Sequence, residues 1–168
     1  MVKVMGKIMD YNLTEFENFF VDKCKEVFLF LEKEFDCNLE SQIKNTCGLT
    51  ICYKNSTTAI QISLEERDGG IFVELVRLVN NKISERPIQI NKRTKLYRFD
   101  LEDLLDVKNA SLKIEHPPLE DLVFNSGREK VVEKVLIQYA EGVRRYAKDV
   151  LNGDFAIFSQ LERVIKDR

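Results

Sequence analysis

Histidine and cysteine are the side chains that most often carry chemistry in proteins, and this chain uses both sparingly. His116 is the single histidine, whereas nucleophile–base–orienter triads and most zinc sites depend on this residue type. Glu115 precedes it, but adjacent side chains rarely face each other, and Pro117 and Pro118 follow, so we expect a residue of a surface loop. These positions predict no catalytic residue.

The cysteines argue against a metal centre. Their spacing lacks the short pairs with which two thiolates bind one zinc ion. The N-terminus also lacks the apolar run and the small-residue cleavage site of a secretory signal, so we expect a cytoplasmic protein with four reduced thiols, packed as small buried hydrophobes. They are Cys24, Cys37, Cys47 and Cys52. We expect no metal and no cofactor.

Motifs for phosphate binding or nucleophilic catalysis are missing from the sequence. It contains no GxxxxGK[ST], GxGxxG or GxSxG, so neither a phosphate cradle nor a nucleophile elbow is indicated. Carboxylate pairs such as Glu65–Glu66 and Glu102–Asp103 occur in any chain with 28 acidic residues and carry no weight alone. The sequence therefore favours a protein that is not an enzyme, and a small hydrolase or transferase with carboxylate chemistry is the weakest alternative.

Basic charge is concentrated in residues 82–98, which could contact nucleic acid. The whole chain has 26 basic and 28 acidic residues, unlike a dedicated nucleic-acid binder, and a solvated loop or a charged edge strand explains the segment more simply. Nucleic-acid binding would also require the segment to join Arg144, Arg145 and Lys148 in one patch. Its basic residues are Lys82, Arg86, Lys92, Arg93, Lys95 and Arg98.

Acidic charge is concentrated at the other end of the chain, in the first predicted helix. At 100° per residue, most acidic side chains there lie opposite the phenylalanine face. They form either a solvated helix back or a surface that recognises a basic protein partner, because complementary charge accelerates encounter. The residues of this acidic face are Glu15, Asp22, Glu26 and Asp36.

Residues 14–35 predict one long helix. Thr14 and Glu17 have the spacing of a capping box, and no Gly or Pro interrupts the segment. An apolar arc this wide predicts packing against more than one element, or against a second copy of the chain in a homo-oligomer. The arc comprises Phe16, Phe20, Cys24, Val27, Leu31 and Phe35, with Phe19, Phe28 and Phe30 on its flanks.

The middle of the chain changes to a strand-like period. Residues 48–54, 57–64 and 71–79 are rich in β-branched side chains and predict an antiparallel meander, with a turn at Asp68 and Gly69. The third of these segments is apolar on both faces except at Glu74 and Arg77, which predicts a central or doubly covered strand. Residues 80–98 predict a long connection with at most a fourth, edge strand around Ile88 and Ile90.

Helical signals return in the last third. Asp100 precedes the apolar periodicity of residues 101–108, and Ser126 with Glu129 resembles a second capping box before a long helix to Val150. Asn152 and Gly153 predict a left-handed stop, and residues 158–165 a last short helix.

The elements together predict the fold class. We expect one α+β domain over residues 1–168, with an antiparallel meander of three to five strands covered on one face by two long helices, and with short C-terminal helices. Residues 1–12 are expected to be a flexible N-terminal segment. No membrane span is expected, because the longest apolar run, residues 27–31, is far shorter than the roughly 20 residues that a bilayer requires.

The C-terminal stretch LNGDFAIFSQLERV, residues 151–164, resembles the tail of small uncharacterised bacterial α+β proteins, some of which are similar to immunity proteins that neutralise toxins by binding them. The order of helix, meander and helix agrees loosely. The resemblance implies a stoichiometric binding protein without catalysis, and it transfers no functional residue.

Overall fold

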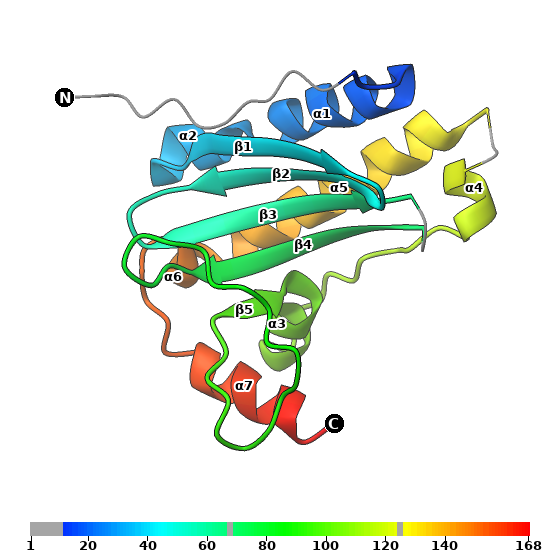
Figure 1. Cartoon of the computed structure of the whole chain (residues 1–168). Coiled ribbons are helices and arrows are strands. Elements are labelled where there is room, and N and C mark those ends of the chain that lie inside the picture. Colours follow the sequence, from blue (N-terminus) through cyan, green and yellow to red (C-terminus); the bar gives the residue numbers. More distant parts are fainter. Residues whose placement is uncertain (1–11, 67–68, 124–125) are drawn as a thin grey trace.

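The computed structural model describes residues 12–66, 69–123 and 126–168, and in these ranges one sheet is the centre of the molecule (Figure 1). It is antiparallel throughout, in the order β1-β2-β3-β4-β5, so every strand pairs with its neighbour in sequence. The strands are β1 (Asn38–Asn45), β2 (Gly48–Lys54), β3 (Thr58–Glu65), β4 (Gly70–Arg77) and β5 (Arg98–Asp100).

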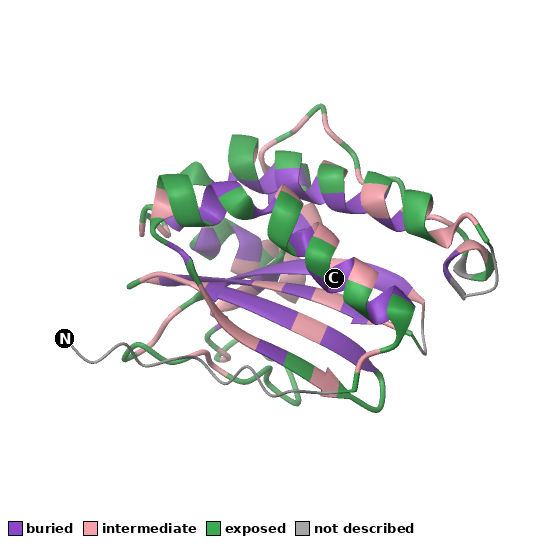
Figure 2. Ribbon diagram, turned by 90° about the horizontal axis from the view of Figure 1, so that it is seen from above, coloured by how far each residue is buried: buried purple, intermediate pink, exposed green. Residues whose placement is uncertain are grey.

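Helices gather on one side of this sheet, with buried residues between the two layers (Figure 2). This arrangement confirms the predicted α+β class and the antiparallel meander. The helices are α1 (Glu15–Val27), α2 (Leu29–Phe35), α3 (Leu101–Val107), α4 (Leu119–Val123), α5 (Arg128–Tyr146), α6 (Lys148–Leu151) and α7 (Phe158–Lys166).

The strand register separates an apolar face of the sheet from a polar one. Because successive side chains of a strand point to opposite faces, residues paired across neighbouring strands share a face. One row, Ile51–Ile62–Val73, lies in the core with the helices, whereas the adjacent row, Cys52–Gln61–Glu74–Asp100, lies on the opposite face. Leu78 and Ile83 of the connection after β4 cover part of that opposite face. The prediction that residues 71–79, most of which form β4, are a central or doubly covered strand is therefore confirmed, because β4 lies between β3 and β5 and is covered on both faces.

The single helix predicted for residues 14–35 is wrong, because the chain breaks at Phe28 into α1 and α2. The capping box is confirmed: the backbone N–H of Glu17 donates to Thr14 Oγ1 at 3.1 Å, and that of Thr14 to Glu17 Oε2 at 2.8 Å. The apolar arc is too wide for one straight helix to bury. With the break, Phe28 and Leu31 are as fully buried as Phe20.

Other strands and helices differ from the prediction in their position or their ends. β1 was not predicted, and the fourth strand expected around Ile88 and Ile90 is replaced by β5, because Arg98–Asp100 is the segment that pairs with β4. The second capping box is wrong: Gly127, not Ser126, is the N-cap residue of α5. That helix ends at Tyr146, and α6 follows it.

Two predicted features fall partly or wholly outside the described ranges. The flexible segment expected at residues 1–12 lies outside the described ranges, except for Asn12. Asp68 of the predicted turn also lies outside them. The left-handed stop after α6 is confirmed at Gly153, whose φ is 84°.

Candidate functional site

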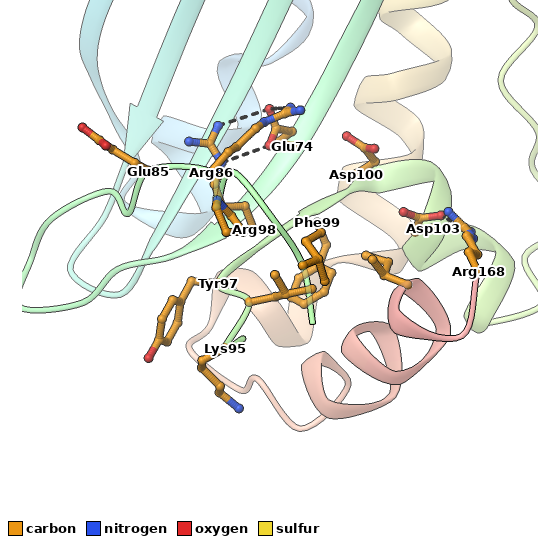
Figure 3. A pocket seen from close by; sticks show the side chains of 14 residues that line it. Glu74, Glu85, Arg86, Lys95, Tyr97, Arg98, Phe99, Asp100, Asp103 and Arg168 are labelled. Atoms are coloured by element: carbon orange, nitrogen blue, oxygen red, sulfur yellow. Dashed lines mark hydrogen bonds and ion pairs between the residues drawn. The ribbon is translucent and has the colours of Figure 1, made fainter. Parts of the chain in front are cut away.

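A cavity of about 320 Å³ lies between β4, β5 and the connection that joins them (Figure 3). Buried Leu96 and Phe99, together with Ile165 of α7, give it an apolar wall. Charged side chains from β4, β5, α3 and the connection complete the lining. We call it the β4–β5 cavity.

Glu74 is the buried centre of the charged wall, with 7% of the residue exposed. Its carboxylate accepts hydrogen bonds from Arg98 Nε at 3.1 Å and Arg98 Nη2 at 3.2 Å, and a further one from Arg86. Arg98 also donates to Gln61 and, at 3.2 Å, to the carbonyl of Ser84. The two arginines thus fasten the connection across the polar face of the sheet.

A second ion pair lines the same cavity at the start of α3. Arg168 Nη2 lies 2.5 Å from Asp103 Oδ1, and the Asp103 side chain is mostly buried. Lys95 lies 3.7 Å from Glu162, whose carboxylate also binds Lys166 at 2.7 Å and accepts the backbone N–H of Leu96 at 3.1 Å. Glu74 and Asp103 are therefore both neutralised by arginine.

Asp100 differs from these two acids. It pairs with Glu74 in the β4–β5 register, so both side chains lie on the polar face. No described residue forms a hydrogen bond or ion pair with its carboxylate, and Figure 3 shows it between Glu74 and Asp103. Asp100 is exposed as a residue, but the surrounding protein desolvates its carboxylate, and this raises its pKa. Repulsion from Glu74, and less so from Asp103 and Glu102, adds to the increase, whereas attraction to Arg86 opposes it.

A smaller hollow of about 220 Å³ shares Asp100, Asp103 and Arg168 with the β4–β5 cavity. Tyr139 of α5 also lines it, and its hydroxyl lies 2.8 Å from Glu102 Oε1 and 2.9 Å from the Ile71 carbonyl. The two hollows meet at the same pair of aspartates.

His116 lies in the irregular segment before α4, as expected for a surface loop residue. Its Nε2 is 2.7 Å from Glu102 Oε1, and Glu115 pairs with Lys134 at 2.5 Å. The bond to Glu102 fastens the segment to α3, and Tyr139 shares the same carboxylate oxygen.

The residues predicted for the acidic face are all exposed. Glu15, Asp22 and Glu26 lie seven and four positions apart on α1, whereas Asp36 ends α2 in a left-handed conformation with φ 54°. Glu26 pairs with Lys23 at 2.9 Å. In the described ranges, no hydrogen bond or ion pair engages the other three carboxylates, so they remain available for a partner.

The predicted basic segment is divided by the fold. Arg86 and Arg98 form ion pairs with Glu74. The other four cations of the segment are exposed. These are Lys82, Lys92, Arg93 and Lys95. On α5, Arg144 pairs with Glu34 and Arg145 with Glu141, so these two arginines already have acidic partners within the chain.

The cysteines follow the prediction at three positions of four. Burial raises the pKa of Cys24 well above its usual range, and that of both Cys37 and Cys52 to about 11. Cys47 is exposed, so its prediction as a buried hydrophobe is wrong: it lies in the turn between β1 and β2, where Asn45 Oδ1 accepts its N–H at 2.8 Å.

Sequence reasoning missed the β4–β5 cavity, although one signal pointed to it. Glu74 is the only acidic residue in the apolar strand of residues 71–79, and a buried carboxylate requires a cationic partner. The sequence indicates only that Asp100 precedes a helix; it is the N-cap residue of α3, and its side chain makes no capping hydrogen bond.

Comparison with known proteins supplies no relative: no family model, no curated protein and no solved structure matches the chain. Across the described ranges, no helix has the length and apolar character that crossing a membrane requires. Nor do three or more His, Cys, Asp or Glu side chains converge there as metal ligands would.

Proposed function

We propose that the protein is a non-catalytic binding module of the immunity-protein kind, which acts in the bacterial cytoplasm and recognises a basic protein partner through the acidic face of α1. One observation carries the proposal: Glu15 and Asp22 are exposed and unpaired within the described structure, on the side of α1 opposite the buried Phe16 and Phe20. The resemblance of residues 151–164 to immunity-like proteins supports the same class.

The framework beneath this face favours recognition without rearrangement. The capping box fixes the first turn of α1, and the helix packs along α5. Arg128 of α5 lies 4.0 Å from the ring of Phe16, and Lys23 bridges to Glu133 at 3.3 Å. A charged surface on a rigid helix can steer a partner at little entropic cost.

The alternatives receive less support. For nucleic acid, two of the six basic residues of residues 82–98 are engaged by Glu74. For carboxylate chemistry, Glu74 and Asp103 are already paired with arginine, so neither carboxylate is free to act on a substrate.

The test is charge reversal on α1. The double variant Asp22→Lys/Glu26→Lys is compared with the wild type in binding to the protein that co-purifies from the source cell. We expect association to slow about ten-fold at low ionic strength and to lose most of its salt dependence, because exposed rim charges act mainly on the association rate.

A matched control separates position from net charge. Asp106 and Asp167 are also exposed, and they lie on α3 and at the end of α7, away from α1 (Figure 1). The variant Asp106→Lys/Asp167→Lys makes the same change in net charge and should associate nearly as fast as the wild type. Equal rates for the α1 variant and the wild type, or equal slowing by both variants, would refute recognition by the acidic face.

A further inference from the structure

The β4–β5 cavity is lined by residues of β5 and α7, which lie on the side of the sheet away from α1 (Figure 1), so an inference from it does not depend on the proposed function. Its walls combine an apolar surface with a charged one. Small-molecule sites also combine an apolar wall with placed polar groups.

Each cation that lines the cavity has an acidic partner within the protein. Arg86 and Arg98 bind Glu74, and Arg168 binds Asp103 at 2.5 Å. Arg98 directs its remaining donors to Gln61 and to the Ser84 carbonyl. An anionic ligand would have to compete with these carboxylates for the cations.

The cavity is also lined by a carboxylate, that of Asp100. The Asp100 carboxylate has no hydrogen-bond or ion-pair partner among the described residues, and the β4–β5 register places it directly beside Glu74. Desolvation by the surrounding protein is the main cause of the raised pKa of Asp100, and repulsion from Glu74 adds to it, whereas attraction to Arg86 opposes it.

The apolar wall limits what kind of cation fits. Leu96 and Phe99 are buried beneath the cavity, and Ile165 closes one side. The volume of about 320 Å³ accommodates a compact organic molecule. A metal ion would leave this surface unused, and the described residues hold no cluster suited to one.

We propose that the β4–β5 cavity binds a small organic cation, a primary ammonium group on an apolar body, with the Asp100 carboxylate accepting the ammonium hydrogen bonds and the wall of Leu96, Phe99 and Ile165 contacting the body. Asp100 also lines the neighbouring hollow, so an ammonium group can reach its carboxylate from either hollow. Charge-assisted hydrogen bonds of this kind are about twice as strong as neutral ones.

The test uses phenethylammonium as the probe and 2-phenylethanol as its neutral counterpart of the same shape. Each is titrated into the full-length protein near pH 7, where the amine is charged, and backbone amide shifts are followed by NMR. We expect saturable shifts at Phe99, Asp100 and Leu101 with phenethylammonium, with a dissociation constant on the order of 1 mM for a probe of this size. The alcohol should bind about ten-fold more weakly or not at all.

Two variants complete the experiment. Asp100→Asn should weaken phenethylammonium binding about ten-fold and leave the alcohol unaffected. Glu129→Gln makes the same charge change in the first turn of α5, at an exposed residue outside the cavity, and should change neither. The proposal is overturned if no saturable shift occurs at Asp100 and its neighbours, if the alcohol binds as tightly as the amine, or if Asp100→Asn binds the amine like the wild type.

Discussion

Replacing Glu74 by Gln should destabilise the protein more than any other single change of a charged residue in the β4–β5 cavity. The substitution keeps the size of the side chain and removes its charge. Arg98 then retains Gln61 and the Ser84 carbonyl as acceptors but has no carboxylate to balance it.

The magnitude follows from the burial of the pair. The side chains of Glu74 and Arg98 are only 9% and 15% exposed, so the charge left behind is poorly solvated. Removing one partner of a buried pair typically costs about 3 to 5 kcal/mol. The Arg86 side chain is 65% exposed, so its ion pair with Glu74 contributes little to the free energy of unfolding. Because Arg98 keeps two acceptors, we expect the low end, about 3 kcal/mol, which corresponds to a melting temperature lower by about 6 to 12 °C.

The assay is urea denaturation followed by circular dichroism, with two comparison variants. Arg86→Gln should cost less than about 1 kcal/mol, because its guanidinium reaches solvent. The double variant Glu74→Met/Arg98→Met removes both charges and should be less destabilised than Glu74→Gln alone, because a buried pair replaced by apolar groups leaves no charge unbalanced.

Two results would refute this reasoning. A cost below about 1 kcal/mol for Glu74→Gln would mean that water reaches Arg98 and that the pair contributes only as a surface pair does. A double variant less stable than Glu74→Gln would mean that the arginine stem and its other hydrogen bonds, and not charge balance, hold the connection in place.

Three other predictions concern the core, the pH dependence and the thiols. Leu31→Ala, at a fully buried position, should lower the free energy of unfolding by about 2 to 5 kcal/mol in chemical denaturation; a loss below about 1 kcal/mol would place this residue outside the core. Asp100→Asn should stabilise the protein near pH 7, because the raised pKa of Asp100 shows that folding disfavours its charged form. Thermal unfolding across pH should show this gain shrinking as pH falls through the raised pKa, and vanishing below the ordinary aspartate range near 3.9; a constant gain would have another cause. Iodoacetamide should alkylate Cys47 in the native protein and spare the buried thiols, as mass spectrometry can show, whereas labelling of all four would mean that the native state opens readily; the spared residues are Cys24, Cys37 and Cys52.

Much of the fold was predictable because its elements carry strong local patterns. The capping box at Thr14 set the start of α1, and the alternating β-branched segments gave β2, β3 and β4. β1 was not predicted because Asn38–Asn45 is a polar edge strand in which only Gln42 is buried. The break at Phe28 was not predicted because no Gly or Pro lies there. It results from the tertiary packing of the wide apolar arc.

The candidate sites were predictable to different degrees. The acidic face depends on helical periodicity alone, so its exposure followed from sequence. The β4–β5 cavity depends on the pairing of β4 with β5, which brings Asp100 beside Glu74 across a long connection. Local patterns do not specify that register. For the same reason, the sequence could not show that Arg86 and Arg98 both pair with Glu74.

The most direct test of partner recognition is an NMR cross-saturation experiment on the complex with the co-purified partner. Irradiation of the partner should attenuate amide signals of α1 around Glu15, Asp22 and Glu26, and leave β5 and α7 unaffected. A footprint on the exposed basic residues of the connection, such as Lys92 and Arg93, with α1 unaffected, would contradict recognition through the acidic face.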